Sequence, residues 1–383
     1  MSVTQPRGFT AAGVESGLKA SGGRDIAFVV NTGPSQAAAA VFTSNRAKAN
    51  PVIWSQQAIA DGILRAVVLN SGGANCYTGS RGFQVTHATA ELAASLLGAS
   101  ASDILICSTG LIGDQLDFDK VSAGLTAAHG SLSDDGGLDA ALAIMTTDTH
   151  PKQSVVSRDG WSIGGMAKGA GMLAPGLATM LVVITTDADL PSAVLDATLR
   201  EATRVTFDRL DSDGCMSTND TVALLASAAS GISPAADDFG AALTELCADL
   251  AAQLQQDAEG AAHDITIEVV SAASEDDAVE VGRAVARNNL FKAAVFGNDP
   301  NWGRVLAAVG TTAAAFDPYD IDVTINGIRV AHAGEPDQSR ELVDLTGRAV
   351  HLVIDLNAGE STATIRTNDL THDYVHENSA YSS

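Results

Sequence analysis

A lysine and a threonine in the segment 168–188, KGAGMLAPGLATMLVVITTDA, have side chains suited to acyl transfer. Lys168 precedes a loop of Gly, Ala and Pro, and Thr179 stands where a run of apolar and β-branched residues begins. A threonine hydroxyl is a weak nucleophile that needs a nearby base. An α-amine, with a reference pKa of roughly 7.7 to 8.0, suits that task near neutral pH. Thr179 could therefore supply its own base if it were the first residue of a chain.

Thr179 gains a free α-amine only if the bond between Ala178 and Thr179 is cut. Attack of the Thr179 hydroxyl on the Ala178 carbonyl would turn that amide into an ester, and hydrolysis of the ester would release the amine. A strained loop rich in Gly and Pro before a rigid strand could present this geometry. The same pattern fits a threonine that only opens a strand, so the residues alone leave both interpretations open.

Two further segments place glycine and hydroxyl side chains directly after strand-like runs. SGGANCYTG, residues 71–79, matches neither the dinucleotide nor the P-loop fingerprint, and a tight turn explains it equally well. CSTGLIG, residues 107–113, places Thr109 beside Gly110. A strand that ends in Thr-Gly can direct a hydroxyl and a backbone N–H at one point, as an oxyanion hole requires, although the bare pattern is common.

The patterns that could suggest a metal site do not support one. In the acidic stretch 208–220, aligning Gly214 with the glycine of a calcium-binding loop puts Arg209 where the first acidic ligand belongs. His372 and His376 lie four residues apart but lack the glutamate of an HExxH motif, and the four cysteines form no CxxC pair. We therefore expect no metal.

Strand-like and helix-like patterns alternate along the chain, and the elements that they predict must position these candidate residues. Their mixture lacks a strict βα repeat, which favours stacked sheets with helices outside over a doubly wound nucleotide fold. Strands are expected at 25–30, 65–70, 103–108, after Thr179, 264–270 and 320–325. Helices are expected at 82–98, 114–128, 136–145, 235–256 and from Trp302. In 235–256 one apolar face is made by Phe239, Leu243, Leu246, Leu250 and Leu254.

The formal net charge of −24 restricts the classes of partner. Asp and Glu outnumber Lys and Arg by 46 to 22, which would repel nucleic-acid phosphates and anionic lipids. The N-terminus lacks a secretory apolar region, and no stretch approaches the roughly 18 apolar residues of a membrane-spanning helix. We expect a cytoplasmic protein that binds neither nucleic acid nor membrane, and whose anionic substrates need a local cation.

Several long motifs together resemble the ornithine acetyltransferase family of arginine biosynthesis. They occur in family order across essentially the whole chain, which is far more specific than any one of them. They are SGGANCYTG, CSTGLIG, MTTDTHPK (145–152), KGAGMLAPGLATM (168–180), MSTND (216–220), EGA (259–261), GNDPNWGR (297–304) and HENSAYSS (376–383).

The resemblance implies an αββα sandwich of the N-terminal-nucleophile type, with a smaller C-terminal α/β subdomain at roughly 270–383. It implies self-cleavage between Ala178 and Thr179 into an α chain, residues 1–178, and a β chain, residues 179–383. Two α and two β chains would form a heterotetramer.

The resemblance also assigns roles to particular residues. Thr179 would be the nucleophile, and Thr109 and Gly110 would form the oxyanion hole. Contacts to substrate would come from Lys168, Thr179, Glu259, Asn378, Ser383 and one of Thr146 and Thr147, of which we favour Thr147.

The implied reaction moves an acetyl group from N-acetylornithine to glutamate in two steps through an acetyl-Thr179 enzyme. Ornithine leaves first and N-acetylglutamate second, without a cofactor. Whether acetyl-CoA is also a donor stays open. The chain departs from the family at Gly73, at Cys76-Tyr77 and at Ala262-His263, where EGATK is common. The last change removes a cation near Glu259, so the substrate preference is less determined than the reaction type.

Two other functions remain possible on this sequence. A self-processing aminopeptidase of the same fold would transfer the acyl group to water instead of glutamate. A non-enzymatic protein whose glycine-rich loops only hold an anion would stay a single intact chain.

Overall fold

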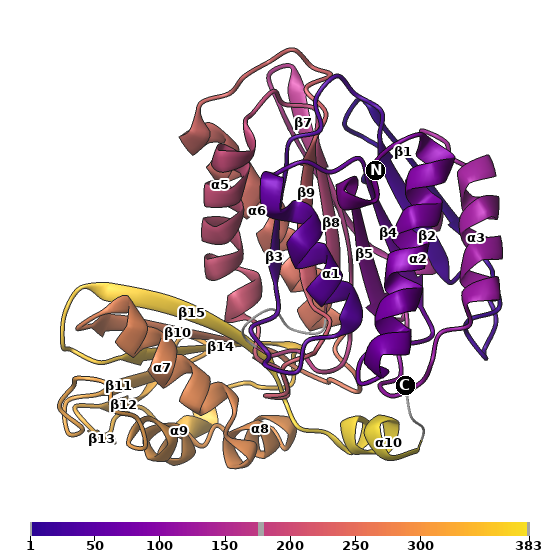
Figure 1. The fold of residues 1–383 in the computed structure, drawn as a ribbon. Helices are drawn as coiled ribbons and strands as arrows, with labels where there is room; N and C mark the ends of the chain where they lie inside the picture. Colours follow the sequence, from indigo (N-terminus) through magenta and orange to yellow (C-terminus); the bar gives the residue numbers. More distant parts are fainter. Residues whose placement is uncertain (1, 175–179, 381–383) are drawn as a thin grey trace.

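The computed structural model describes residues 2–174 and 180–380. Within them the chain forms two lobes (Figure 1). The larger lobe holds two sheets with helices outside them, and the smaller lobe is built on a third sheet, drawn in orange and yellow. No helix in these ranges is long and apolar enough to cross a membrane.

The two sheets of the larger lobe are mostly antiparallel, with one parallel pair in each: β4 with β5, and β8 with β9. The first has the order β1-β2-β4-β5, with bounds Phe9–Val14, Ile26–Asn31, Ala66–Ser71 and Ile104–Thr109. The second has the order β3-β9-β8-β7-β6, with bounds Ala38–Phe42, Thr221–Ala226, Leu181–Thr186, Trp161–Lys168 and Lys152–Arg158.

Alternate side chains of each strand point to opposite faces, and this alternation builds the layers. Val29 of β2 and Val183 of β8 share the apolar core between the sheets. Phe28 faces the opposite way into a second core, while Ile184 packs in a third. The helices that cover the outer faces are α2 (Gly79–Leu97) and α3 (Phe118–Gly130) on one side, and α5 (Ser192–Val205) and α6 (Ala236–Gln256) on the other.

This arrangement confirms the expected αββα sandwich. The predicted leucine-rich face of α6 is fully buried in the core under β6 to β9. Two further helices, α1 (Asn50–Ala58) and α4 (Gly137–Ala143), complete the larger lobe, and short 3₁₀ helices lie at Ile59–Asp61, Ala101–Asp103, Phe207–Arg209 and, in the smaller lobe, Arg340–Leu342.

The smaller lobe pairs strands in the order β13-β12-β11-β14-β10-β15. The first strand of this sheet along the chain is β10 (Asp264–Ala272). In it Ile265, Ile267 and Val269 are buried, as their alternation predicts. The other strands are β11 (Asp322–Ile325), β12 (Ile328–His332), β13 (Glu335–Pro336), β14 (Ala349–Asp355) and β15 (Ser361–Asn368). Helices α7 (Glu275–Ala286), α8 (Asn289–Phe296) and α9 (Trp302–Val309) share its core, and α10 (His372–Ala380) follows.

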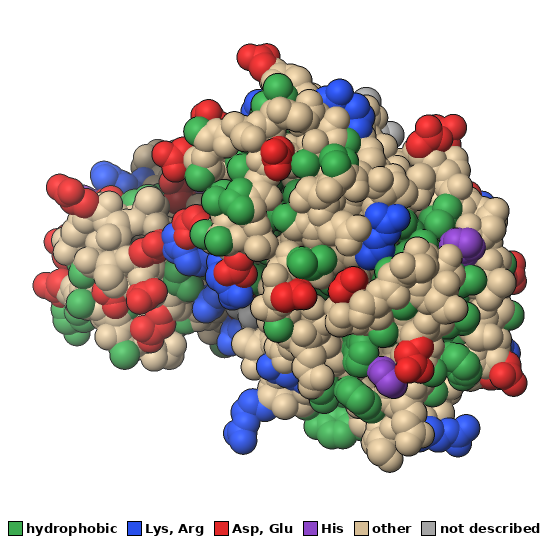
Figure 2. Space-filling view, turned by 45° about the horizontal axis from the view of Figure 1, so that its top comes forward, with side chains coloured by type: hydrophobic (Ala, Val, Ile, Leu, Met, Phe, Trp, Pro, Cys, Tyr) green, Lys and Arg blue, Asp and Glu red, His purple; other side chains and the backbone are tan. Residues whose placement is uncertain are grey.

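The lobes are joined by charged and polar contacts. Figure 2 shows Asp and Glu side chains over both lobes and a group of Lys and Arg side chains where the lobes meet. Arg204 of α5 and Arg209 each approach Glu275 of α7 to 2.6 Å.

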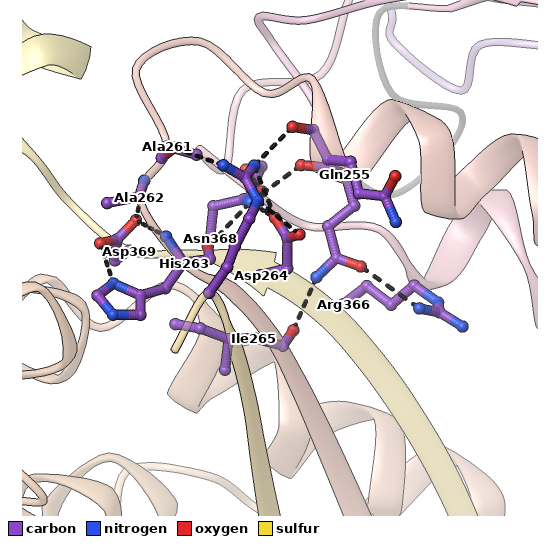
Figure 3. Close-up of polar contacts among 12 residues, drawn as sticks. Gln255, Ala261, Ala262, His263, Asp264, Ile265, Arg366, Asn368 and Asp369 are labelled. Atoms are coloured by element: carbon purple, nitrogen blue, oxygen red, sulfur yellow. Dashed lines mark hydrogen bonds and ion pairs between the residues drawn. The ribbon is translucent and has the colours of Figure 1, made fainter. Parts of the chain in front are cut away.

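A buried polar network lies deeper in the same junction (Figure 3). Gln255 of α6 donates from Nε2 to the carbonyls of Ile265 and Thr367 at 3.0 and 2.9 Å, while Asn368 donates to the carbonyls of Gln255 and His263 at 3.0 and 3.1 Å. These contacts fix the end of α6, and thus the loop 257–263, to the smaller lobe.

Candidate active site

Two of the sequence candidates are the last residues of strands, one in each sheet of the larger lobe. Thr109 is the last residue of β5 and Lys168 the last of β7. Because β7 pairs antiparallel with β8, Lys168 lies opposite Leu181, two residues after Thr179. Ala178, Thr179 and Ser383 themselves lie outside the described residues, and β8 begins at Leu181.

Lys168 is buried and hydrogen-bonded to two threonines. Its Nζ donates to Thr146 Oγ1 at 2.8 Å and to Thr109 Oγ1 at 3.3 Å. Burial lowers the pKa of Lys168, while Asp148, Asp220 and Glu259 act in the opposite direction. The structure therefore brings Thr109, Thr146 and Lys168 together, and it places Thr146, not Thr147, on the lysine.

The two glycine-rich motifs form one unit around Gly110. The Gly73 N–H donates to the Thr109 carbonyl at 2.9 Å, and the Ala74 N–H donates to Leu111 at 2.9 Å. Gly110 has a φ of +123°, and a Cβ atom there would lie 2.6 Å from the Gly73 nitrogen. Only glycine satisfies both conditions, since other residues rarely adopt such a φ.

Asn219 of the MSTND motif ties this unit together. Its side-chain amide donates to the Ala74 carbonyl at 2.6 Å and to the Ser108 carbonyl at 2.8 Å. The amide therefore holds both loops, one from each motif, next to β9.

Asp148 organises the 145–152 motif. Its Oδ2 accepts the Thr146 N–H at 3.0 Å, and its Oδ1 accepts the Gly169 N–H at 2.7 Å. Burial opposes ionisation, but Lys168, Lys152 and the hydrogen bonds outweigh it and lower the pKa of Asp148 to about 2. This carboxylate therefore stays charged at neutral pH.

Glu259 lies beside the chain that follows Lys168. Its N–H donates to the Ala170 carbonyl at 3.0 Å, and its carboxylate accepts from Asn378 Nδ2 of α10 at 3.0 Å. Gly171 makes this approach possible, because a Cβ there would lie 2.6 Å from Glu259 Oε2. Glu259 lines two cavities, one of ≈ 310 Å³ with Asp213 and Lys292, and one of ≈ 780 Å³ with Thr147.

Two aspartates hold the chain on either side of the predicted cleavage bond. Asp213 accepts the Met172 N–H at 2.7 Å, and Asp220 accepts the Met180 N–H at 3.1 Å. Burial raises the pKa of Asp220 well above its usual value, against the Met180 N–H and Lys168. Asp220 Oδ2 is buried and has no hydrogen-bond partner among the described residues.

Sequence reasoning gave no role to Asp148, Asp220 or Asn219, although all three lie in quoted motifs. Asp213 lies in the acidic stretch 208–220, which sequence reasoning considered only as a calcium-binding loop. Within residues 2–174 and 180–380, no three His, Cys, Asp or Glu side chains gather as a metal site would require.

His263 stands where the EGATK motif has lysine, and its ring points into the lobe junction. Its Nδ1 lies 2.7 Å from Asp369 Oδ2 (Figure 3). Its Nε2 lies 2.9 Å from the Leu345 carbonyl. Both ring nitrogens thus lie within hydrogen-bond distance of an oxygen atom of the smaller lobe.

Comparisons with known proteins agree along the whole chain. Residues 10–383 match the family model described as the ArgJ family. The chain is 64% identical to the arginine biosynthesis bifunctional protein ArgJ of Streptomyces coelicolor, with both chains fully covered. It is 55% identical to the protein of that name from Mycolicibacterium paratuberculosis, covering all of this chain and 96% of that one.

Two solved structures are also similar in sequence. One is an ornithine acetyltransferase complexed with ornithine from Mycobacterium tuberculosis, 52% identical, with a TM-score of 0.45 over 47% of this chain and 96% of that one. The other is an arginine biosynthesis bifunctional protein ArgJ from Bacillus halodurans, 33% identical, with a TM-score of 0.49 over 51% of this chain and 97% of that one. On the family model and the curated relatives, the chain belongs to the ArgJ family.

Proposed function

We propose that the protein transfers an acetyl group from N-acetylornithine to glutamate in arginine biosynthesis, in the cytoplasm. Membership of the ArgJ family supports an acetyltransferase of this pathway. The observation that carries the proposal is the buried ammonium of Lys168, which contacts the hydroxyls of Thr109 and Thr146 at the strand ends next to the predicted nucleophile. A buried cation at this point suits the carboxylate that both substrates share.

The active enzyme would form by self-cleavage. The Thr179 hydroxyl attacks the Ala178 carbonyl, the amide becomes an ester, and water hydrolyses that ester to leave a free α-amine on Thr179. The α chain of residues 1–178 and the β chain of residues 179–383 stay together, and two such pairs form a heterotetramer.

Acetyl transfer would then proceed by a ping-pong mechanism. The Thr179 α-amine takes the hydroxyl proton as Oγ attacks the acetyl carbonyl of N-acetylornithine. Thr109 and Gly110 hold the negative oxygen, and ornithine leaves with the proton from the α-ammonium. The amine of glutamate then attacks the acetyl ester, which regenerates Thr179 and releases N-acetylglutamate.

The described contact residues divide into two groups. Lys168, with Thr146, would hold a substrate carboxylate, and Glu259, with Asn378, would face a substrate ammonium. Thr147 lines the cavity beside Glu259, and Ser383 completes the set expected from the family resemblance. The reaction as proposed uses no cofactor.

Mass spectrometry of the wild type and of Thr179→Ala tests the maturation step. We expect fragments beginning at Met1 and Thr179 in the wild type and an uncut chain in the variant. An uncut wild type that still transfers acetyl groups would exclude the proposed mechanism. Native mass spectrometry of the same sample tests the heterotetramer.

Incubation of the cut enzyme with N-acetylornithine, with and without glutamate, tests the acceptor. We expect N-acetylglutamate with glutamate and only slow release of acetate without it. Rapid acetate release that glutamate does not suppress would indicate a hydrolase instead. Replacing N-acetylornithine by acetyl-CoA in the same assay determines whether the enzyme also accepts an acetyl thioester.

A further inference from the structure

Lys152 is a buried cation to which the proposed reaction assigns no role. It is the first residue of β6, and its side chain has no exposed surface. Its Nζ lies 2.6 Å from Asp148 Oδ1 and 2.6 Å from Asp257 Oδ2. A lysine can remain charged at such depth only when carboxylates compensate the loss of water, and Lys152 has two.

Each of these carboxylates holds a different segment of the candidate site. Asp148 accepts the N–H groups of Thr146 and Gly169, which flank the contact between Thr146 and Lys168. Asp257 accepts the Thr149 N–H at 3.0 Å and also binds the Thr149 hydroxyl. Lys152 therefore joins the 146–149 segment to the loop that carries Glu259, two residues after Asp257.

The charges of the two lysines, Lys152 and Lys168, and of the carboxylates beside them also determine whether Lys168 is available to a ligand. Lys152 and Lys168 carry two positive charges, and Asp148 and Asp257 carry two negative ones. Asp148 is the carboxylate that acts most strongly on Lys168. Without Lys152, Asp148 would depend for its balance on Lys168 and the half-buried Lys19, and it would compete with a substrate carboxylate for Lys168.

We propose that Lys152 is a positioning residue for both substrates: it neutralises Asp148 and Asp257, leaves Lys168 available to a substrate carboxylate, and aligns the 146–149 and 257–259 segments. The inference rests on the proposed function, in which Lys168 binds that carboxylate. Lys152 itself touches no reacting atom.

Steady-state kinetics of Lys152→Met tests the proposal, because methionine is also unbranched, is only one atom shorter than lysine and removes the charge. Rates are measured on folded, cleaved enzyme and divided by the acetyl-enzyme burst, so that misfolded material does not count. We expect KM for glutamate and for N-acetylornithine to rise about tenfold or more, while kcat falls less than about threefold. Lys120→Met, at an exposed lysine of α3, is the control with unchanged kinetics.

Double variants separate charge balance from simple packing. In Lys152→Met/Asp148→Asn the competing carboxylate is gone, and we expect KM to recover at least about threefold relative to Lys152→Met. Lys152→Met/Asp257→Asn keeps Asp148 charged and should not recover. A purely structural lysine would give no such difference between the two double variants.

Lys152→Gln covers the case in which the methionine variant does not fold, because its amide still offers an N–H to each carboxylate without a charge. The same rise in KM is expected. Unchanged KM values in a folded charge-removing variant, with wild-type turnover intact, would overturn only this inference. A wild type that forms no N-acetylglutamate would overturn the proposed function and this inference with it.

Discussion

Under the proposed function, Lys168 would let a protein with a net charge of −24 hold an anionic amino acid. The overall field repels anions, but charges exposed to water are screened within about 10 Å at moderate salt. A cation buried behind Thr109 and Thr146 interacts through a medium of much lower dielectric constant. Recognition as proposed would therefore depend on this local charge and its two hydroxyl partners, and not on the charge of the whole surface.

Two threonine variants distinguish the two candidates of the MTTDT motif. Thr146→Val removes the hydroxyl that accepts from Lys168 at 2.8 Å, whereas Thr147→Val changes a side chain that lines the larger cavity. We expect Thr146→Val to raise KM for glutamate about tenfold to a hundredfold, since a hydrogen bond to a charged group contributes about 1.5–3 kcal/mol. Thr147→Val should have the smaller effect. Initial-rate kinetics at matched protein concentrations compare the rise in KM of the two variants. A larger rise in Thr147→Val than in Thr146→Val would contradict the prediction.

Asp211 should make stability depend on pH. Burial raises the pKa of Asp211 to about 6, although Arg287 Nε donates to it at 2.7 Å. Between the unfolded value of 3.8 and about 6, the folded chain keeps a proton that the unfolded chain loses. The contribution of this group to stability is therefore full below pH 4 and falls as the pH rises through that window.

Urea denaturation of the wild type and of Asp211→Asn at pH 4, 5, 6 and 7 measures this effect. The free energy of unfolding of the wild type should fall relative to that of the variant by roughly 2–3 kcal/mol across the range. Comparing the two proteins at each pH cancels the titration of all other groups. A constant difference from pH 4 to pH 7 would contradict the prediction.

At the scale of elements, the loop at Gly110, which we propose as part of the oxyanion hole, depends on a close approach of two backbones. Gly110→Ala would place a Cβ 2.6 Å from the Gly73 nitrogen at a φ of +123°, whereas Gly113, at a φ of +96°, has open space around it. Gly113→Ala should cost only the backbone strain of about 1 kcal/mol. Gly110→Ala should lower the thermal midpoint further and reduce kcat at least about tenfold, because the loop must move.

Calorimetry and turnover measured on both glycine variants test that difference. Similar losses at the two positions would mean that backbone conformation, and not the contact with Gly73, fixes the loop. Gly113 is a suitable control since it lies in the same motif and its own N–H donates to the Cys76 carbonyl at 3.0 Å.

Periodic apolar patterns predicted the amphipathic elements, and short apolar runs predicted the fully buried strands β2, β4, β5 and β8 but not β7 or β9. The face of α6 and the alternation in β10 lie in the core as expected. Strand β7, WSIGGMAK, is buried along its whole length, so it shows no alternation that a pattern could detect. The smaller lobe begins at Asp264, earlier than the expected 270, because β10 belongs to the smaller lobe's sheet from its first residue.

The candidate site likewise contains some residues that sequence motifs mark and others whose roles no local pattern predicts. Thr109 and Lys168 are at strand ends that motifs mark, so sequence and family resemblance could find them. The roles of Asp148 and Lys152 depend on Asp257, 105 residues away from the lysine, and no local pattern records such a pairing. Those contacts exist only once β6 and α6 have packed against each other.

At the scale of the whole molecule, the lobe junction connects stability with the site. The loop 257–263 carries Glu259 and is fixed at one end by Gln255 and at the other by His263, both bound to Asn368 (Figure 3). Asn368 is buried, and its Oδ1 accepts from Ser212 Oγ at 2.5 Å. A change at this one amide should therefore loosen the docking of the lobes and displace Glu259 together.

Asn368→Ala tests this coupling. It leaves the Gln255 and His263 carbonyls without their side-chain donor, and a buried unsatisfied group costs about 1–3 kcal/mol, so the free energy of unfolding should fall by roughly 2–4 kcal/mol. KM should also rise in Asn368→Ala, because the loop that carries Glu259 loses an anchor. The control is Gln338→Ala, at an exposed amide, which should change the free energy of unfolding by no more than about 0.5 kcal/mol and leave KM unchanged. Urea denaturation and initial rates on the same samples measure both effects. A large loss of stability with an unchanged KM would mean that the smaller lobe supports the fold without positioning Glu259, and the contact between Glu259 and Asn378 of α10 would then be sufficient to hold that carboxylate.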